Sequence, residues 1–375
     1  MKKKLIFLLL LISSLLLFAC KDKNVAEKEK EVKEEEVKDE RIFSPLGGSQ
    51  VDSIIDDKRV IGIMIDNHPD AQPQSGLLDA EVIYEFKAEG EFTRYLALYQ
   101  KDYPKIVGPI RSARPYFVDT AAEYQALYIH WGGSEAGYNE IAAAGLDDLD
   151  GIALEGISFF RNKEVKKKKP HNGYTTDELI LAQMDKRKIS KTGSFRPFKF
   201  GDDEVMEKAT RACDEITLSF NPTHEMKYIY DKDLDAYKII RNGTPLIDEK
   251  FIASSTNEGF VTADNLIVEF ASSRVTGPLG TLTIDHIGSG KGLFVSRGKV
   301  EEITWEKSDV HAKTIFKDLN GNEITLKRGR TWVSVLDPED PVTILPEEVK
   351  TTQKEEGSQT TNKSTNENTK AENKK

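Results

Sequence analysis

The chain has 375 residues, a formal net charge of −10 at pH 7, and only 2 cysteines. Two cysteines exclude both a disulfide framework and a zinc site built from cysteines. The acidic balance argues against general nucleic-acid binding, which needs a basic surface, while the length is enough for two hydrophobic cores.

The N-terminus has the layout of a secretory signal that ends at a cysteine. Three lysines precede the apolar run Leu5–Phe18, which is too short to span a bilayer comfortably. A small residue followed by Cys20 resembles a bacterial lipobox. Residues 1–19 are therefore predicted to be a lipoprotein signal peptide, and Cys20 is predicted to carry fatty acyl chains such as palmitate. The alternative is an ordinary secretory signal with an incidental cysteine.

This signal predicts where the protein lies and what it meets. The lipid would hold the chain on the extracytoplasmic face of the cell membrane. Cleavage removes three lysines and takes the net charge from −10 to −13, so nucleic acid is not an expected partner. Lipidation of Cys20 leaves Cys213 without a disulfide partner. Cys213 is then a buried thiol or, alternatively, a nucleophile.

Both ends of the mature chain are too polar to build a core. Residues 20–44 are dominated by Lys, Glu, Asp and Val and are predicted to form a charged, disordered tether. Residues 346–375 are rich in Thr, Asn, Gln, Lys and Glu and are predicted to form a disordered polar tail.

Between these ends, residues 45–200 are predicted to form a mixed α/β domain. Apolar and β-branched runs predict four strands: Arg59–Ile65, Glu81–Phe86, Thr93–Tyr99 and Ala126–Trp131. Helix-start signals predict three helices: after Pro115, after Ser134, and from Thr176 to about Lys188. Alternating strands and helices are typical of an α/β layer.

Residues 201–345 are predicted to form a second, β-rich domain, either a sandwich or an open barrel. Short strands recur there with turn signals between them, including the Asn-Gly pairs at Asn242 and Asn320. The predicted strands include Tyr228–Tyr230, Leu266–Phe270 and Thr331–Val335. The fold class expected for the whole chain is α+β, with the mixed domain first.

The most site-like stretch is Gly108–Tyr116, where Arg111, Ser112 and Arg114 lie between two prolines at a predicted helix start. Pro115 suits the first helical turn, because its missing N–H is not needed there. Donors gathered at a helix N-terminus can bind an anion. The alternative is that these arginines only neutralise carboxylates and loop carbonyls.

Further polar residues stand at predicted strand ends or in loops, where functional groups are usually placed. The expected ligand-binding residues are Arg94, Arg111, Ser112, Arg114, His171 and Asn172, and the expected acid/base residues are Asp66, Glu85 and Glu89. Convergence of these groups on one cleft would let arginines hold an anionic or zwitterionic ligand beside a proton-transfer group.

Several motif matches fail on their context. The acidic run Asp231–Asp235 lacks the glycine and the glutamate of a calcium loop and is predicted to be a hairpin turn. The glycines of 288–292 precede a strand, which rules out a dinucleotide fingerprint or a P-loop. Six scattered histidines show no zinc-ligand spacing. No metal and no cofactor are predicted.

The motifs of both halves resemble the YerB-like lipoproteins of Gram-positive bacteria. In the first half the resemblance rests on Asp66-Asn67, Gln72–Leu77, Tyr84-Glu85, Glu89-Gly90, Thr93-Arg94, Gly108–Arg114 and His171-Asn172. In the second half it rests on Tyr237, Arg241–Gly243, Gly288–Gly290 and Gly329–Trp332. The resemblance implies a membrane-anchored extracytoplasmic protein with two paired domains of unknown function, and it implies no reaction.

Three functions are open at this point. The first is a non-enzymatic envelope factor that binds a wall component or a wall-synthesis protein. The second is a hydrolase or transferase of a wall polymer, in which Glu85 or Glu89 is the acid/base and Arg111 and Arg114 hold the substrate. The third is a solute-binding lipoprotein that serves a transporter.

Overall fold

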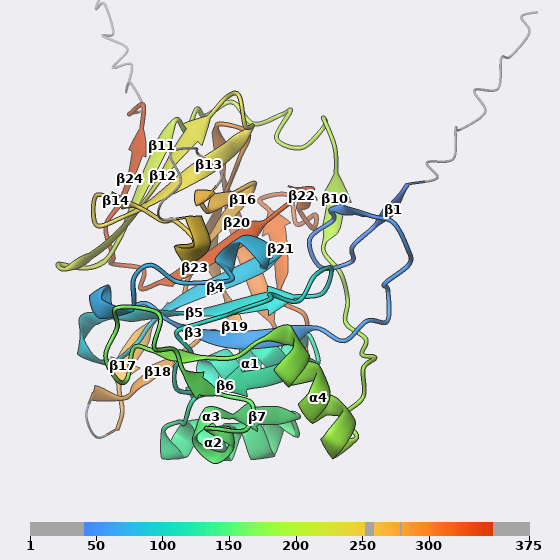
Figure 1. The fold of residues 1–375 in the computed structure, drawn as a ribbon. Coiled ribbons are helices and arrows are strands. Elements are labelled where there is room, and N and C mark those ends of the chain that lie inside the picture. The colour runs from blue at the N-terminus through green and yellow to red at the C-terminus, as the bar shows by residue number, and fades with distance from the viewer. Residues whose placement is uncertain (1–40, 252–258, 278–279, 348–375) are drawn as a thin grey trace, which may run out of the picture. The chain divides into compact units, whose positions relative to one another are not determined.

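The computed structural model describes residues 41–251, 259–277 and 280–347 (Figure 1). The predicted signal peptide, Cys20 and the tether as far as residue 40 lie outside the described residues, as does the predicted tail from residue 348 onward. Within the described ranges, we find no helix that is both long and apolar enough to cross a membrane.

The helices lie in the first half of the described chain. They are α1 (Pro115–Glu123), α2 (Glu135–Ala144), α3 (Gly151–Leu154) and α4 (Asp177–Arg187), with short 3-10 turns η1 (Pro69–Ala71), η2 (Leu77–Asp79) and η3 (Glu89–Glu91). The Ser134 side chain accepts a hydrogen bond from the Gly137 amide at the start of α2, and the Thr176 side chain accepts one from Leu179 at the start of α4. These caps satisfy helix amides that lack intrahelical partners. The three predicted helices are confirmed.

A ten-stranded mixed sheet crosses the molecule in the order β21-β20-β19-β16-β23-β4-β5-β3-β6-β7. Five of its strands come from the first half of the chain: β3 (Ile61–Asp66), β4 (Val82–Lys87), β5 (Thr93–Tyr99), β6 (Leu127–His130) and β7 (Asp148–Asp150). The other five come from the second half: β16 (Asn265–Phe270), β19 (Gly288–Ser296), β20 (Lys299–Lys307), β21 (Ile315–Asp318) and β23 (Thr331–Leu336). The junction is the parallel pair β23–β4, in which Trp332 lies opposite Ile83 and Val333 opposite Tyr84.

A second sheet has the order β14-β13-β12-β11-β24, with β15 also paired to β13. Its strands are β11 (Glu215–Asn221), β12 (His224–Asp231), β13 (Ala236–Arg241), β14 (Thr244–Pro245), β15 (Thr262–Ala263) and β24 (Val342–Leu345), and η4 (Glu249–Phe251) follows β14. The predicted hairpin turns are confirmed at 231–236, which joins β12 to β13, and at Asn242-Gly243, where both residues have positive φ, 46° and 76°.

Four two-stranded pairs complete the described structure. They are β1–β2 (Ile42–Phe43, Gln50–Val51), β8–β9 (Phe160–Arg161, Gly173–Tyr174), β10–β22 (Lys199–Gly201, Thr325–Lys327) and β17–β18 (Ser273–Val275, Leu282–Ile284). The predicted fold class is confirmed, with a mixed α/β part followed by a β-rich part.

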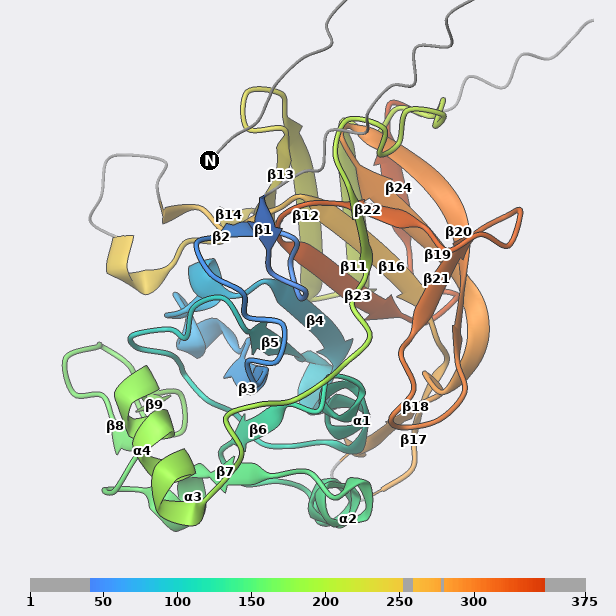
Figure 2. The same ribbon diagram turned by 90° about the vertical axis from the view of Figure 1, so that its right-hand side faces the viewer.

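Side chains alternate between the two faces of the large sheet, and each face has its own core. Ile63, Tyr95 and Trp332 pack into the core that also contains the apolar residues of β11–β13. Met64 and Leu96 pack into the other core, with α1. Because the central strands β3 and β5 are covered on both faces, every residue in them is buried. Residues of α2 join α1 in this second core, whereas residues of α3 and α4 belong to the first core, with β11–β13. Figure 2 shows α1 and the β11–β13 strands on different sides of β4 and β5.

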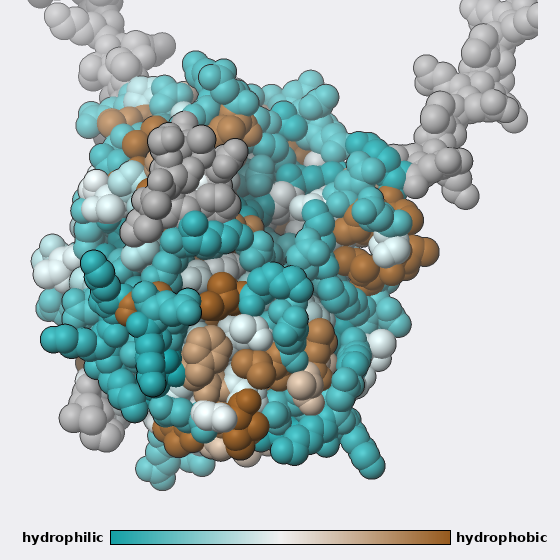
Figure 3. All heavy atoms as spheres, in the orientation of Figure 1, coloured by the Kyte–Doolittle hydropathy of each residue, from teal (hydrophilic) through white to brown (hydrophobic). Residues whose placement is uncertain are grey.

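The outer surface in the orientation of Figure 3 is largely hydrophilic, and apolar residues form small groups between polar ones. Large exposed apolar side chains of the described chain, such as Ile54, Ile152 and Leu319, come from separate segments. Single exposed apolar residues are normal for folded proteins. These separate side chains therefore do not mark a binding site on this surface.

Candidate functional site

A cleft of about 630 Å³ opens where β3 ends and β5 begins. These strands are antiparallel neighbours, so Asp66 at the end of one is paired with Arg94 at the start of the other. The cleft contains six of the residues predicted from the sequence: Asp66, Glu89, Arg94, Arg111, Arg114 and His171. Its volume lies within the range usual for small-ligand sites.

Asp66 and His171 form a buried pair in this cleft. The His171 Nδ1 atom lies 2.7 Å from Asp66 Oδ2, and the His68 amide donates to Asp66 Oδ1 at 3.0 Å. Burial alone would raise the pKa of Asp66, but the hydrogen bond from His171 and the positive charge of Arg111 hold that pKa below its usual value. Asp66 is therefore an ionised acceptor that orients the His171 ring, and it is poorly suited to donate a proton.

Aromatic rings form one wall beside this pair. The His68 ring stacks on the His171 ring, with centroids 4.3 Å apart and planes 20° apart, and it contacts the Phe92 ring at 4.5 Å. Burial and the neighbouring His171 lower the pKa of His68, so a neutral ring is favoured near pH 7. These rings offer both apolar surface and ring nitrogens to the cleft.

Glu89 holds two of the three arginines in place. The Arg94 Nη2 atom donates to Glu89 Oε2 at 3.2 Å, and Arg114 donates to the same oxygen at 2.8 Å and also to Oε1. The Nη1 atoms of Arg94 and Arg114 donate to the backbone oxygens of Ser112 and Ala113, respectively. Burial would raise the pKa of Glu89, but the two guanidinium groups lower it. Burial, together with the charge of Arg114, lowers the pKa of Arg94 to about 10.

Arg111 differs from both of these arginines. Its backbone is fixed, because its amide donates to the Met64 oxygen and its oxygen accepts from the Trp131 amide, each at 3.0 Å. Its guanidinium has one ion-pair partner among the described residues, Asp66 Oδ2 at 3.7 Å from Nε, and no hydrogen bond to any of them. The side chain is 26% exposed. The described residues therefore leave the donors of the Arg111 guanidinium unused, and its backbone is held by the neighbouring segments.

The other predicted residues lie outside the cleft. Glu85 is fully buried in β4, where its carboxylate accepts from Thr93 Oγ1 at 2.7 Å, lies 2.9 Å from His224 Nε2, and accepts from Trp332 Nε1 at 3.3 Å. Ser112 contributes its backbone oxygen to Arg94. Asn172 accepts from the Asn162 amide through its backbone oxygen. The acid/base role of Glu85 stays a prediction, and the structure gives its carboxylate no access to the cleft.

The sequence analysis missed the side chains of the second half of the chain that hold the buried Glu85 carboxylate beside this region. His224 and Trp332, which bind Glu85, stand 139 and 247 residues from it along the chain. His68 carried a signal, since it follows Asp66 and Asn67 directly at the end of a predicted strand. Phe92 carried none, because an aromatic residue before a strand is ordinary.

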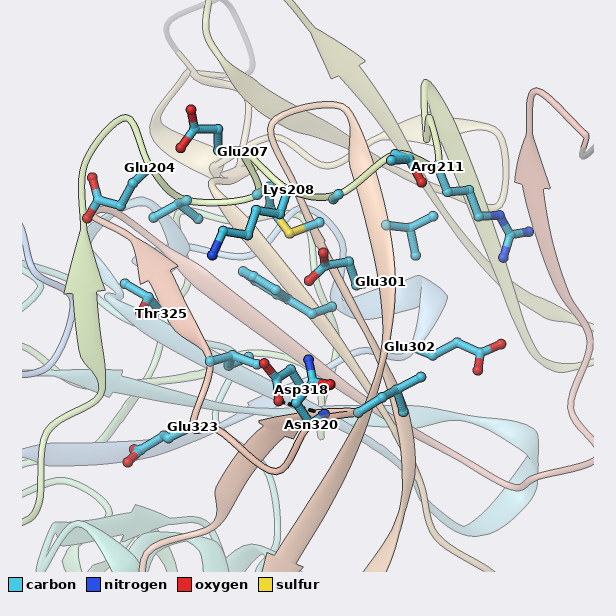
Figure 4. Close-up of a pocket in the computed structure, with 18 residues that line it drawn as sticks. Glu204, Glu207, Lys208, Arg211, Glu301, Glu302, Asp318, Asn320, Glu323 and Thr325 are labelled. Atoms are coloured by element: carbon cyan, nitrogen blue, oxygen red, sulfur yellow. Dashed lines mark hydrogen bonds between the residues drawn. The ribbon is translucent and has the colours of Figure 1, made fainter.

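A larger hollow of about 770 Å³ lies elsewhere, between residues 204–211 and strands β20 to β22 (Figure 4). Figure 4 shows the carboxylates of Glu204, Glu207, Glu301 and Glu302 spread around this hollow instead of meeting at a point. Asp318, also on its rim, accepts from the amides of Asn320 and Asn322 and so belongs to a turn. The cleft at Asp66 remains the better candidate, since its polar groups converge.

The fold and these motifs define a two-domain family of unknown function. Residues 46–190 match the family described as "Protein of unknown function (DUF3048) N-terminal domain", and residues 216–333 match the "Protein of unknown function (DUF3048) C-terminal domain". The chain belongs to this family.

The chain is also similar to a protein described as a putative lipoprotein. The "Putative lipoprotein YerB" of Bacillus subtilis (strain 168) is 28% identical over 308 residues, which cover 81% of this chain and 89% of that protein. The crystal structure of the YerB protein from Bacillus subtilis matches with a TM-score of 0.72 at 26% identity, covering 81% of this chain and 100% of that one. The predicted resemblance is confirmed.

Proposed function

We propose that this protein is lipid-anchored on the extracytoplasmic face of the cell membrane and binds an anionic component of the cell envelope in the Asp66 cleft. Support for the location comes from the signal-like N-terminus, its Cys20, and the similar protein described as a putative lipoprotein. Support for the ligand comes from one observation, the Arg111 guanidinium that faces the cleft without a hydrogen-bond partner in the described chain.

The chemistry of the cleft favours a carboxylate or a phosphate. A guanidinium presents a planar fork of donors that matches both groups, and charge-assisted hydrogen bonds are about twice as strong as neutral ones. The ring wall of His68 and Phe92 would cover an apolar or sugar part of the ligand. Wall peptides supply carboxylates, and anionic wall polymers supply phosphates.

The test measures binding of two probes, a wall stem peptide and a poly(glycerol phosphate) fragment, to the full-length protein in mild detergent. We expect one of them to bind, and Arg111→Gln to weaken that binding about 10- to 100-fold, because a hydrogen bond to a charged group contributes about 1.5–3 kcal/mol. Arg328→Gln is the matched control. Arg328 is also 26% exposed and also has one ion pair, with Asp202, but it lies outside the cleft.

Two outcomes would contradict the proposal. One is the absence of binding to either probe. The other is binding that Arg111→Gln and Arg328→Gln affect equally, since the arginine in the cleft would then have no special part.

The membrane anchor is tested separately. We expect Cys20→Ala to move the protein from the membrane fraction to the culture fluid, because a single replaced thiol removes the site of acylation. Cell fractionation with an antibody against the protein measures this. Cys213→Ala is the control and should stay at the membrane. Unchanged retention of the Cys20 variant would refute lipidation as the sole anchor.

The second candidate, a hydrolase or transferase of a wall polymer, is favoured by the Asp66–His171 pair. A histidine oriented by a carboxylate can act as a general base toward water or a sugar hydroxyl. Glu89, ionised and held by two arginines, suits this role less well than His171. Mass spectrometry of the binding mixtures separates the candidates, because products that disappear in His171→Gln would indicate catalysis.

A further inference from the structure

Three side chains of the kind that bind metals meet at the His68 side of the cleft. His68 is the N-cap of η1, Asp70 lies within η1, and His171 precedes β9. One ligand atom from each of the three lies within 4.8 Å of the others. Among the histidine, cysteine and carboxylate side chains of the described ranges, His68, Asp70 and His171 form the group that lies close enough together to share one ion.

A second observation comes from the far side of the His171 ring. His171 Nδ1 lies 2.7 Å from Asp66 Oδ2, and because an ionised carboxylate can only accept, Nδ1 carries the hydrogen. The lone pair is then on Nε2, for which the described chain provides no partner. Histidines that bind metals almost always donate their other N–H to a carboxylate or a carbonyl in this way.

We propose that His68, Asp70 and His171 bind one divalent transition-metal ion, with Zn²⁺ as the best-suited ion, and that Asp66 positions His171 for it. Two imidazoles and one carboxylate are ligands that zinc uses, and three protein ligands leave a coordination position open. Imidazole also suits nickel, copper and iron, whereas calcium prefers a set of oxygen ligands.

The ion requires two side chains to move. Zinc bonds of about 2.0 Å place tetrahedral ligand atoms about 3.3 Å apart, which is closer than the 4.8 Å limit of the present arrangement. The His68 ring must also leave its stack on His171, because the lone pairs of two nearly parallel rings do not point at one ion. His68 and Asp70 have side chains 27% and 76% exposed, which leaves both room to move. If His68 binds the ion through Nδ1, it gives up the hydrogen bond that Nδ1 accepts from the Asp70 amide. His171, 11% exposed and held by Asp66, stays in place.

A metal at this position would extend the chemistry of the cleft. Arg111 Nε lies 3.7 Å from the Asp66 oxygen that holds His171, and Arg111 lines the same cleft as His68 and His171. A ligand oxygen could then occupy the open position on the ion while Arg111 holds a second oxygen. Metal binding does not depend on the proposed envelope ligand, and it is measured without one.

The experiment uses full-length protein in mild detergent, purified without a histidine tag and stripped with EDTA. Isothermal titration with ZnCl₂ alone is expected to show one ion per chain, and titration with CaCl₂ only weak binding. His68→Ala, Asp70→Asn and His171→Ala should each weaken zinc binding at least about tenfold, and Asp66→Asn should weaken it about 10- to 100-fold. With Co²⁺ in place of Zn²⁺, Asp66→Asn should also shift the visible absorption bands, which a purely structural role would leave unchanged.

His311→Ala and Asp52→Asn are the matched controls, because both residues are exposed and lie outside the cluster, and both variants should bind zinc normally. Thermal melting of each variant without metal shows whether it folds, and His68→Ala decides the matter if His171→Ala is unfolded. The proposal is overturned if no stoichiometric zinc binding occurs. It is also overturned if zinc and calcium bind alike and the histidine variants change neither, since the acidic tether would then be the binder.

Discussion

Glu269 is a buried carboxyl group that has no cationic hydrogen-bond partner among the described residues, so its ionised form is disfavoured in the folded protein. Glu269 in β16 is 3% exposed, and its Oε1 has no hydrogen-bond partner in the described chain. Burial raises its pKa from 4.5 to about 8, the neighbouring Glu123 carboxylate adds to this effect, and Lys307 opposes it. Glu269 is therefore mostly protonated in the folded protein at neutral pH.

This pKa predicts how stability depends on pH. Because the pKa of Glu269 is higher in the folded than in the unfolded chain, its contribution is fully present below about pH 4.5 and is lost as the pH rises to about 8. The loss is about 1.4 kcal/mol per pH unit at most. We expect Glu269→Gln to flatten the fall in the free energy of unfolding between pH 5.5 and 8, and to make the variant more stable than the parent by on the order of 2 kcal/mol or more at pH 8.

Urea unfolding of both proteins at pH 5.5, 7 and 8 measures this difference. Glu302→Gln, at an exposed position of strand β20 in the same sheet, is the control and should leave the pH dependence unchanged. Equal slopes in the parent and in Glu269→Gln would mean that Glu269 is ionised in the folded state.

In the sequence, Arg111 and Arg114 have the same predicted role, but in the structure their guanidinium groups have different partners. Both were predicted to lie in a loop before a helix, and both do. Glu89, in the η3 turn, accepts hydrogen bonds from Arg94 and Arg114, whereas no hydrogen bond joins it to Arg111. A pattern of residue types cannot show which of the two arginines has hydrogen-bond donors left unused, because this depends on contacts with another segment of the chain.

At the scale of elements, local sequence signals were enough to predict strands that are buried on one face or on both faces, and helices that begin at a capping residue. The continuous apolar run before Asp66 predicted β3, all of whose residues are buried, and the period of two in β11 gives alternating burial. The caps Ser134 and Thr176 marked their helices correctly. Gly288–Gly292, singled out as glycine-rich, lies within β19, where a side chain at Gly292 would come within 2.5 Å of the Val268 oxygen.

At the scale of the whole molecule, strand order is what the sequence could not predict. The predicted boundary between residues 200 and 201 falls inside β10, which pairs with β22 near the end of the described chain. The central pair β23–β4 joins strands that are far apart in sequence. Such pairings leave no signal in the local sequence, because they depend on which strand edges are available elsewhere in the fold.

The shared sheet predicts that the two parts fold as one cooperative unit, although the family descriptions divide them. Residues 41–200 alone would lose β23 and β16, which would leave β4 with an unpaired edge and the Ile63 and Tyr95 face without its β11–β13 cover. They would also lose His224 and Trp332, which satisfy the buried Glu85 carboxylate. In the fragment, Glu85 would keep only its hydrogen bonds with Thr93 and Asn67. The apolar side chains of the uncovered face would be exposed to water, at a cost of about 25 cal/mol per Å² of apolar surface.

We therefore expect the full chain to unfold in a single transition, seen alike by circular dichroism and by tryptophan fluorescence. Residues 41–200 alone should show no cooperative transition and should aggregate, and co-expression with residues 201–347 should recover a soluble complex. The matched control is a chain cut at the same point by an inserted protease site after folding, which should stay assembled because the β23–β4 pairing is already made. A cooperative melt of residues 41–200 at the temperature of the full chain would show that the first part is an independent domain, and that the common sheet forms only after each part has folded.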